Sequence, residues 1–414
     1  MLPQWARNKK ILLGVSGGIA AYKIPELVRE WLRAGCEVEV ILTEAAAKLV
    51  SPLALSTLLK RRVWRECDFL SDELGWTIPH ITLSGWADVF VVAPCSANTL
   101  QAAATGAAGT LLGAAMLACR APVILFPAMN SNMWANPAVK ANAHAVSERG
   151  YKIIDPDSGM LACGYEGEGR LPSTPAIVDE TWFSIRENKD FAGKKALVTA
   201  GPTHEYIDPV RFISNPSTGK MGCAIAAEAR YRGAEVVLVS GPTNIRRPSG
   251  VRVVGVTSAA EMRDACLAEA GSCDVIIKAA AVGDYRAKNY MEQKIKRGYA
   301  SEITLDLAAN ADIAAELGRM KKPWQILVGF AAETDNMAEN ATAKLDAKQL
   351  DIVAANDVSA DGEGFASDTN RLEIFFAPRH GQKPFSISGS KWEAASGLLD
   401  AVASILPVNE EFRS

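Results

Sequence analysis

Short apolar runs alternate with segments of helical periodicity from the start of the chain. Residues 11–15 form an apolar run that ends in the turn Ser16-Gly17-Gly18. A helical pattern covers residues 19–33 and stops at Gly35, and a second apolar run covers residues 38–42. This order of strand, tight turn, helix and strand predicts the start of a doubly wound α/β sheet. Further buried strands are expected at residues 88–93, 122–126 and 152–154.

The same pattern begins again in the second half of the chain. A strand is expected at residues 195–199, a helix at 219–232 and a strand at 235–240. The later expected elements are strands at residues 275–279, 325–330, 352–354 and 372–376 and a closing helix at 392–405. Residues 187–193 are polar and turn-prone, which is typical of a boundary between domains. We therefore expect two doubly wound Rossmann-like α/β domains, at residues 1–190 and 191–414.

Composition restricts the possible partners. Hydrophobic residues make up 49% of the 414 residues and the net charge is -3, so nothing favours nucleic acid or an anionic membrane. The cysteines form no C-x-x-C pair and the N-terminus lacks a signal peptide, which predicts reduced thiols in a cytoplasmic protein. Residues 89–119 carry no charge, but Pro94 and several glycines interrupt them, so a buried strand with packed helices is favoured over a membrane span.

Small polar groups follow several of the strands expected in the first domain. A glycine-rich turn between a strand and a helix presents backbone N–H groups to an anion, although such a turn alone is a weak signal. The sequence does not match the spaced G-x-G-x-x-G of dinucleotide binders. Thr43, Ser96, Asn98 and Asn130 also lie just after expected strands, at the edge where open α/β sheets bind ligands. The pattern predicts a neutral cradle for a phosphate.

Four segments of the first domain together resemble the homo-oligomeric flavin-containing cysteine decarboxylases. They are GVSGGIAAYK, APCSANT, PAMNSNMW and residues 157–164. The resemblance implies a flavodoxin-like flavoprotein domain that binds FMN, and a trimer with the flavin at a subunit boundary. It places near the flavin Ser16, Gly17, Gly18, Thr43, Ser96 and Asn98. It also implies that His80 is catalytic, that Asn130 holds the substrate carboxylate and that Cys163, on a mobile flap, donates a proton. Without the resemblance, His80 and Cys163 would be interpreted as packing residues, as His144 still is.

The implied chemistry explains why a decarboxylase would need a flavin. When CO₂ leaves a cysteine-derived carboxylate, no neighbouring group can accept the electron pair that remains on the carbon. FMN can take a hydride from the thiol-bearing carbon, and the resulting thioaldehyde then accepts those electrons. Reduction of the enethiol product returns the hydride, so the reaction has no net redox change.

In the second domain, Ser217, Thr218 and Gly219 lie at an expected helix N-terminus, which can bind an anion. The P-loop pattern is absent. The basic run at residues 294–297 would by itself be interpreted as a solvated surface. Lys344 and Lys348 are four residues apart and therefore lie on one face of a helix.

Residues 195–400 resemble the phosphopantothenate–cysteine ligases, and the fused order resembles the bacterial bifunctional enzymes of coenzyme A biosynthesis. The motifs are residues 279–286, 294–297, 329–334 and 355–358. The resemblance implies Mg²⁺ and CTP, an acyl-cytidylate intermediate, and Asn215 acting on that intermediate beside Arg211. Nucleotide contacts are implied for Lys278, Ala279, Ala280, Asp284, Lys294, Ala311, Asp312, Ile313, Ala314, Phe330, Lys344 and Lys348. Ligase dimers and flavoprotein trimers together imply a particle of up to twelve chains.

The sequence departs from these families at a few positions: Cys95, Pro216, Gly283 and Arg297. No departure removes a named chemical group, so both activities are expected with small-molecule substrates. The alternatives are a regulatory protein that binds FMN without turnover, a flavin decarboxylase for another acid, and a dehydrogenase.

Overall fold

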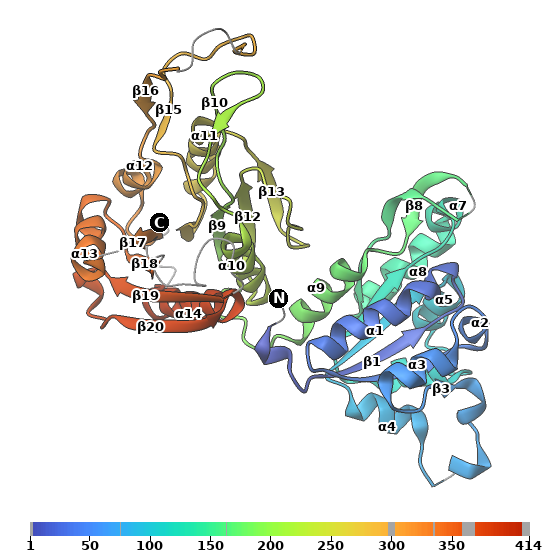
Figure 1. The fold of residues 1–414 in the computed structure, drawn as a ribbon. Helices are drawn as coiled ribbons and strands as arrows, with labels where there is room; N and C mark the ends of the chain where they lie inside the picture. The colour runs from blue at the N-terminus through green and yellow to red at the C-terminus, as the bar shows by residue number, and fades with distance from the viewer. Residues whose placement is uncertain are drawn as a thin grey trace. The chain divides into compact units, whose positions relative to one another are not determined.

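The computed structural model describes residues 3–74, 76–162, 164–296, 303–333, 336–357 and 369–407. Cys163 and Arg297, which the sequence analysis singles out, lie outside the described residues. The chain divides into two compact units between Glu187 and Asn188. Each unit is described by itself (Figure 1).

The N-terminal unit is built on a six-stranded parallel sheet with the order β3-β2-β1-β4-β5-β6. Its strands are β1 (Lys10–Val15), β2 (Glu37–Leu42), β3 (Trp64–Arg65), β4 (Val89–Cys95), β5 (Val123–Pro127) and β6 (Lys152–Ile153). The chain order reverses between β1 and β4, so a crevice opens at the carboxyl ends of these two strands. This arrangement confirms the expected doubly wound fold.

Helices cover this sheet, and several begin at side chains that cap them. They include α1 (Ile24–Arg33), α2 (Glu44–Ala47), α3 (Pro52–Leu59), α4 (Pro79–Trp86), α5 (Ala97–Thr105), α6 (Leu111–Ala118), α7 (Ser131–Ala135), α8 (Pro137–Glu148) and α9 (Thr174–Ile185). The helix expected at residues 19–33 is interrupted. A 3₁₀ turn, η2 (Ile19–Lys23), precedes α1 because Pro25 stands in the first turn of α1, where its missing N–H costs nothing.

The charge-free segment at residues 89–119 folds as β4, α5 and α6 inside the first unit. All seven residues of β4 are buried. Across the described ranges of the chain, no helix is both long and apolar enough to cross a membrane. Phe90 and Leu125 belong to the core on which these helices pack.

The C-terminal unit repeats the strand order of the first. Its eight-stranded sheet runs β13-β12-β9-β14-β17-β18-β19-β20, and the first six strands are parallel. The strands are β9 (Lys195–Ala200), β12 (Glu235–Ser240), β13 (Arg252–Gly255), β14 (Val275–Lys278), β17 (Ile326–Glu333), β18 (Ile352–Asp357), β19 (Thr369–Phe376) and β20 (Phe385–Ser390). β19 and β20 add an antiparallel edge. The sequence pattern did not predict β20, because none of its six residues is buried and its two large apolar residues, Phe385 and Ile387, are separated by a serine.

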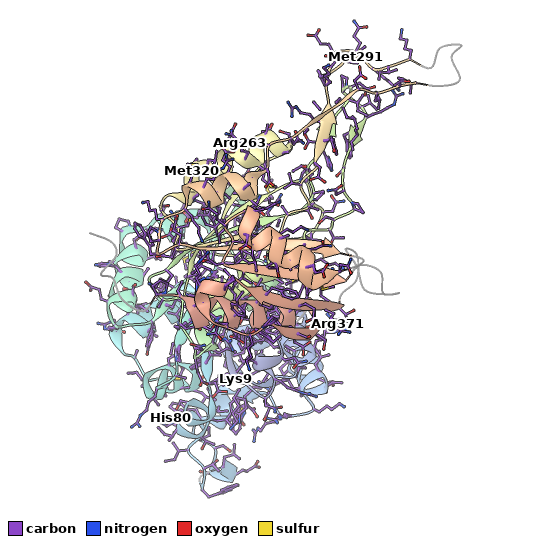
Figure 2. The ribbon with its side chains drawn as sticks, turned by 90° about the vertical axis from the view of Figure 1, so that its left-hand side faces the viewer. Lys9, His80, Arg263, Met291, Met320 and Arg371 are labelled. Atoms are coloured by element: carbon purple, nitrogen blue, oxygen red, sulfur yellow. The ribbon has the colours of Figure 1, made fainter. Side chains whose placement is uncertain are left out.

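Five helices and three hairpins complete the described architecture. The helices are α10 (Lys220–Tyr231), α11 (Ala259–Ala270), α12 (Ile313–Met320), α13 (Met337–Ala347) and α14 (Lys391–Ile405). The hairpins pair β7 (Asp157–Met160) with β8 (Glu166–Arg170), β10 (Glu205–Tyr206) with β11 (Phe212–Ile213), and β15 (Tyr285–Ala287) with β16 (Leu307–Ala309). The β15–β16 hairpin starts an arm that extends away from the sheet, and Figure 2 labels Met291 on it.

Candidate active sites

The crevice of the first sheet is braced by a buried serine. Ser16 follows β1 and is 1% exposed. Its hydroxyl donates to the carbonyl of Pro94 at 2.7 Å and accepts from the backbone N–H of Ser96 at 2.7 Å. Ser16 therefore joins the ends of β1 and β4 at the point where the strand order reverses.

A cavity of about 610 Å³ lies next to Ser16, and α2, α5 and the loop at Gly17 shape it. Thr43 caps α2 by accepting from Ala46 N at 3.2 Å, and Ser96 caps α5 by accepting from Thr99 N at 3.4 Å. A Cβ on Gly17 would lie 2.3 Å from the Ala45 Cβ, so the close approach of these loops requires glycine. The cavity wall contains the predicted flavin residues Ser16, Gly17, Thr43, Ser96 and Asn98.

None of the described residues that line this cavity is basic, but two of them, Glu44 and Glu66, carry carboxylates. Burial raises the pKa of Glu66. The N–H of Leu111, which donates to its carboxylate at 3.0 Å, opposes that shift, and the charge of Glu44 adds to it. An anion in this cavity would therefore depend on hydroxyl and backbone N–H donors.

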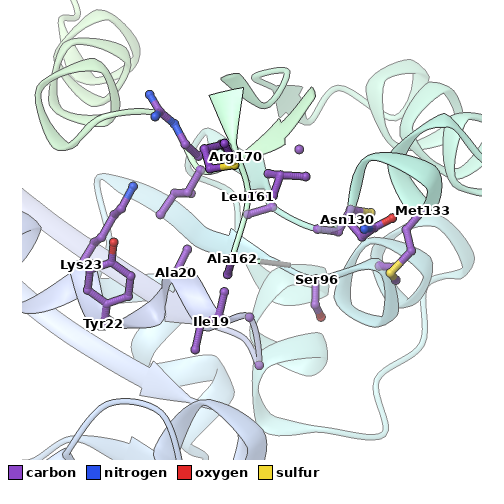
Figure 3. A pocket seen from close by; sticks show the side chains of 18 residues that line it. Ile19, Ala20, Tyr22, Lys23, Ser96, Asn130, Met133, Leu161, Ala162 and Arg170 are labelled. Atoms are coloured by element: carbon purple, nitrogen blue, oxygen red, sulfur yellow. The ribbon is translucent and has the colours of Figure 1, made fainter. Parts of the chain in front are cut away.

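A second cavity, of about 530 Å³, adjoins the first and shares Gly17, Ser96, Ala97 and Met133 with it. It runs along the β7–β8 hairpin and is mainly apolar (Figure 3). Asn130 contributes an amide whose Oδ1 accepts from Asn132 N at 2.9 Å, capping α7. Figure 3 shows Asn130 at one end and the cations Lys23 and Arg170 at the other. The structure thus places Asn130 and Gly18 in this second cavity.

The structure places His80 apart from Asn130. His80 lies on α4, packs edge-on against Phe69 with ring centroids 5.5 Å apart, and lines neither cavity. Its Nδ1 is buried and has no hydrogen-bond partner within the described part of the chain. Leu161 and Ala162, which precede Cys163, line the second cavity.

Two other residues named in the sequence analysis have ordinary surroundings. Cys95 is fully buried, and burial raises the pKa of its thiol to about 12, so it packs as a protonated thiol. His144 lies on the surface of α8 with Nε2 3.3 Å from Glu148.

In the C-terminal unit two adjoining cavities lie at the carboxyl ends of β9, β14, β17 and β18. The first, of about 300 Å³, includes Asn215 and the N-terminus of α10. Gly219 precedes α10 with φ 78°, a conformation that favours glycine. Asn215 Nδ2 donates to the carbonyl of Val282 at 3.0 Å, which ties its loop to the segment after β14. Two deeply placed residues that the sequence analysis did not name, Asn370 and Lys391, also line this cavity.

The second cavity of this unit has a volume of about 240 Å³ and shares Ala280, Val282, Asp284 and Phe330 with the first. Of the predicted nucleotide contacts, the two cavities bring together Lys278, Ala279, Ala280, Asp284, Ala311, Asp312, Ile313, Ala314, Phe330, Lys344 and Lys348. These residues come from four separate parts of the unit, so the tertiary fold assembles the set that the resemblance implied.

Charge in this cavity is concentrated on lysines. Lys278 is 8% exposed and its Nζ has no hydrogen-bond partner within the described ranges. Burial lowers the pKa of Lys278; Cys266 and Asp312 oppose the shift, while Lys348 adds to it. Lys348 Nζ lies 2.9 Å from the Asp312 carboxylate, which also caps α12. An anionic ligand would give Lys278 the partner it lacks.

Lys294 is the one predicted nucleotide contact that lines neither cavity. It is exposed on the arm. The arm is anchored next to it, because Ile295 N donates to Asp208 Oδ2 at 3.1 Å and Arg211 donates to the Ile295 carbonyl at 3.0 Å. Gly283 N donates to the Thr203 hydroxyl at 2.9 Å, so this departure from the family keeps a structured turn.

Two doubly wound units, each with cavities where its strand order reverses, define a two-site α/β protein that can bind small molecules. Residues 2–185 match the family model described as Flavoprotein, and residues 191–406 match that of the DNA/pantothenate metabolism flavoprotein C-terminal domain.

The chain is 43% identical over 401 residues to the coenzyme A biosynthesis bifunctional protein CoaBC of Bacillus subtilis, covering 96% of this chain and 97% of that protein. It is 43% identical over 372 residues to the Escherichia coli K12 protein of the same name, covering 89% and 91%. A crystal structure of a CoaBC C-terminal domain is 39% identical, covers 53% of this chain and 98% of that one, and has a TM-score of 0.45.

The chain therefore belongs to the family of bifunctional coenzyme A biosynthesis proteins. This membership confirms the resemblance seen in both halves of the sequence. It also confirms the expected class of enzyme, a flavoprotein decarboxylase joined to a ligase.

Proposed function

We propose that residues 191–414 ligate phosphopantothenate to cysteine and that residues 1–190 decarboxylate the phosphopantothenoylcysteine so formed. The observation that carries this proposal is the assembly of chemically matched residue sets at the strand-order reversal of each sheet. In the first unit these are neutral donors and Asn130, and in the second they are lysines around Asp284.

The flavin proposed for the first unit is FMN. The cavity around Gly17 is closely shaped, offers hydroxyl and N–H donors for a phosphate, and opens into the apolar cavity that contains Asn130. When bound, FMN would supply a temporary acceptor for the hydride of the thiol-bearing carbon. Asn130 would hold the substrate carboxylate, and Cys163 would donate the proton that completes the saturated thiol.

The position of His80 supports an active site shared between copies of the chain. His80 lines neither cavity of its own unit, so a catalytic role beside Asn130 needs a second copy. We therefore propose that the flavoprotein units form a trimer. If the ligase units also form dimers, the two contacts together build a cytoplasmic particle of up to twelve chains. Coexpression of His80→Asn and Asn130→Asp chains tests this, because only a shared site can recover CO₂ release from two inactive chains.

The ligase proposal rests on the lysine cavity. Lys278, Lys344 and Lys348 would bind the phosphates of CTP, and their charge would stabilise the charge that develops as pyrophosphate leaves. Asn215 would act on the acyl-cytidylate from the adjoining cavity. Among the described residues no three His, Cys, Asp or Glu side chains cluster around a metal position. Mg²⁺ would accordingly arrive with the nucleotide, held by its phosphates and by one or two carboxylates such as Asp284.

One reaction mixture tests both halves of the proposal. The purified protein is incubated with phosphopantothenate, cysteine, Mg²⁺ and either CTP or ATP, and products are followed by mass spectrometry. We expect phosphopantetheine and CO₂ with CTP, and accumulation of phosphopantothenoylcysteine when the flavin has been removed. EDTA should stop ligation while leaving decarboxylation of added phosphopantothenoylcysteine intact. Absence of amide product with both nucleotides would overturn the ligase assignment.

A further inference from the structure

Two buried hydrogen-bond acceptors face the first cavity of the C-terminal unit. The Oδ1 atoms of Asn356 and Asn370 are both buried, and neither has a hydrogen-bond partner among the described residues. Both residues line the cavity of about 300 Å³ that also contains Asn215. Asn370 is 4% exposed and its Nδ2 donates to Met221 Sδ at 3.8 Å, so Oδ1 is the atom of this amide that needs a partner. Because an unpaired buried acceptor is costly, the pair indicates a ligand that donates hydrogen bonds.

The register of the sheet explains why the two amides share one cavity. Asn356 on β18 pairs with Leu372 on β19, and Asn370 lies two residues before Leu372 on the same strand. Residues two apart on a strand point to the same face of the sheet, and so do residues paired across two antiparallel strands. Asn356 and Asn370 therefore project from one face, near the carboxyl end of β18.

A buried cation reaches the same cavity from the next element of the chain. Asn370 pairs with Gly389 on β20, and α14 begins two residues later at Lys391. Glu393 accepts from Ser390 N at 2.6 Å, and a Cβ on Gly389 would collide with that carboxylate, so the tight turn requires glycine. α14 packs against β19 and β20 (Figure 1). The turn thus fixes Lys391, which is 3% exposed and lines the cavity.

This cavity is also suited to an anion. Lys220, Met221 and Gly222, the first turn of α10, line it, and a helix N-terminus presents unpaired N–H groups and partial positive charge. Lys391 is the first residue of α14, where burial and the helix dipole both disfavour a cation. A negatively charged ligand group would offset both costs. The cavity therefore combines an anion-binding part with two acceptors that need a donor.

An amino acid zwitterion matches this combination. Its carboxylate would accept from Lys391 and the first turn of α10, and its ammonium group would donate to Asn356 and Asn370. Phosphate oxygens of a nucleotide offer only acceptors and cannot satisfy the two amide oxygens, whereas an ammonium group makes strong charge-assisted bonds to them. We infer that Asn356, Asn370 and Lys391 form the binding site for cysteine, the second substrate of the ligase. This inference rests on the proposed ligase function and adds the place of its nucleophile.

The position of the site suits the second step of the proposed ligation. Its cavity shares Ala280, Val282, Asp284 and Phe330 with the lysine cavity proposed for CTP, and Asn215 lines it as well. An amine held there lies beside the acyl group that the nucleotide activates. The phosphates of the substrates are the other source of an anion for Lys391. The two sources differ in one measurable property, because only a phosphate contact links Lys391 to formation of the acyl-cytidylate.

Two analogues of cysteine test the two ends of the site in the full chain. Cysteamine lacks the carboxylate and 3-mercaptopropionate lacks the amine. We expect the wild type to favour cysteine over cysteamine in kcat/KM by about tenfold to a hundredfold, because one charge-assisted contact is lost. Lys391→Gln should remove most of this preference, and Lys391→Arg should restore part of it. Exposed Lys383→Gln is the matched control and should keep the full preference.

The amide end is tested with Asn370→Leu, which keeps the shape of the side chain and removes the acceptor. This change should raise KM for cysteine and for cysteamine alike, by about tenfold, and leave inhibition by 3-mercaptopropionate unchanged. Asn370→Asp keeps an acceptor and should keep a low KM for both amines. Exposed Asn244→Leu is the control, and thermal unfolding checks that each variant is folded.

Pyrophosphate release from CTP and phosphopantothenate, measured without cysteine, separates the two sources of the anion. Lys391→Gln should release pyrophosphate at close to the wild-type rate. Slow release with an unchanged KM for cysteine would assign Lys391 to the phosphates and overturn the cysteine site. Equal use of cysteine and cysteamine by the wild type would also overturn it and leave the ligase proposal standing.

Binding of ¹³C-labelled cysteine to the unliganded chain, followed by NMR, decides the inference if the wild type forms neither acyl-cytidylate nor amide. Binding that Lys391→Gln and Asn370→Leu weaken would then support an amino acid site and overturn the ligase function alone. Absence of binding in such a protein would overturn both.

Discussion

The two units share one strand order and differ in how they present charge to a ligand. In the first unit the cavity beside the strand-order reversal has no basic side chain, and its cations lie at the far end of the adjoining cavity. In the second unit Lys278 emerges from the end of a central strand, and Lys344 and Lys348 join it from α13 and its C-cap. The same sheet topology therefore supports two electrostatic designs.

The difference matches what the proposed function requires of each site. In the proposed function a resident flavin needs a shaped cradle with donors for its phosphate, and the uncharged groups of Ser16, Gly17 and Ser96 would provide one. A nucleotide that is cleaved develops charge during the reaction, and preorganised lysines stabilise that charge. The comparison teaches that the charge of each cavity is set by the side chains that line it and not by the strand order of the sheet.

The largest expected effect comes from His80→Asn. If His80 is a catalytic acid or base, this change should lower the rate of CO₂ release at least about a hundredfold. FMN content should remain at the wild-type level because the donors proposed for the flavin phosphate are Ser16, Thr43 and Ser96, and His80 is not one of them. Ligation by the other unit should continue, which would separate the two sites. Headspace CO₂ and flavin absorbance are measured, with His144→Asn on the surface of α8 as the control. Normal CO₂ release from His80→Asn would remove the residue from the mechanism.

Lys278→Met should lower the rate of ligation by about tenfold to a hundredfold, because a charge-assisted contact to the nucleotide is lost. The same change should stabilise the ligand-free C-terminal unit by about 1–3 kcal/mol, because a buried unpartnered ammonium group is removed. Calorimetric unfolding and pyrophosphate release measure the two effects, and exposed Lys383→Met is the control.

The pH dependence of that stabilisation has a defined sign. Burial lowers the pKa of Lys278, so between its folded and unfolded pKa values the unfolded chain binds more protons. The destabilising contribution of Lys278 is therefore fully present below the folded pKa and fades as the pH rises toward the ordinary lysine value. The gain from Lys278→Met should be larger at neutral than at alkaline pH. An equal gain at both would contradict the buried-charge explanation.

A smaller effect, about tenfold, is expected from Lys294→Gln on formation of the acyl-cytidylate. Asn215→Asp should instead allow the intermediate to form and hinder its reaction with cysteine. Quenched reactions with labelled CTP and no cysteine measure the intermediate. Lys294 is exposed on the arm and lines neither cavity. A normal rate of acyl-cytidylate formation in Lys294→Gln would therefore show that Lys294 is a solvated surface residue with no role in this step.

The smallest effect on activity is expected from Cys95→Ala. The thiol has a pKa of about 12 and no exposed surface, so CO₂ release should stay near the wild-type rate from pH 6 to 9, far below that pKa. The loss of one buried sulfur should cost about 1 kcal/mol of stability. Thermal unfolding and CO₂ release are measured together. A large loss of activity with retained stability would give Cys95 a chemical role.

The predicted parallel strands agree with the structure to within a few residues, because buried parallel strands are continuous apolar runs whatever their neighbours. The edge strand β20 was not predicted because none of its residues is buried and it contains no continuous apolar run. Likewise, Lys23 lies inside the motif GVSGGIAAYK, yet nothing in that pattern says where its side chain points.

Local pattern and motif, read from the sequence by itself, determined the two doubly wound units, the polar groups at their strand ends and the family to which the chain belongs. Only the tertiary structure decided which of those groups meet. It joined Lys278 of β14 to Lys344 and Lys348 of α13 and its C-cap, brought Arg170 into the cavity of Asn130 and placed His80 and Lys294 outside the cavities of their units. The physical reason is that strand runs and caps depend on neighbouring residues, whereas a site depends on crossovers and hairpins that join distant segments.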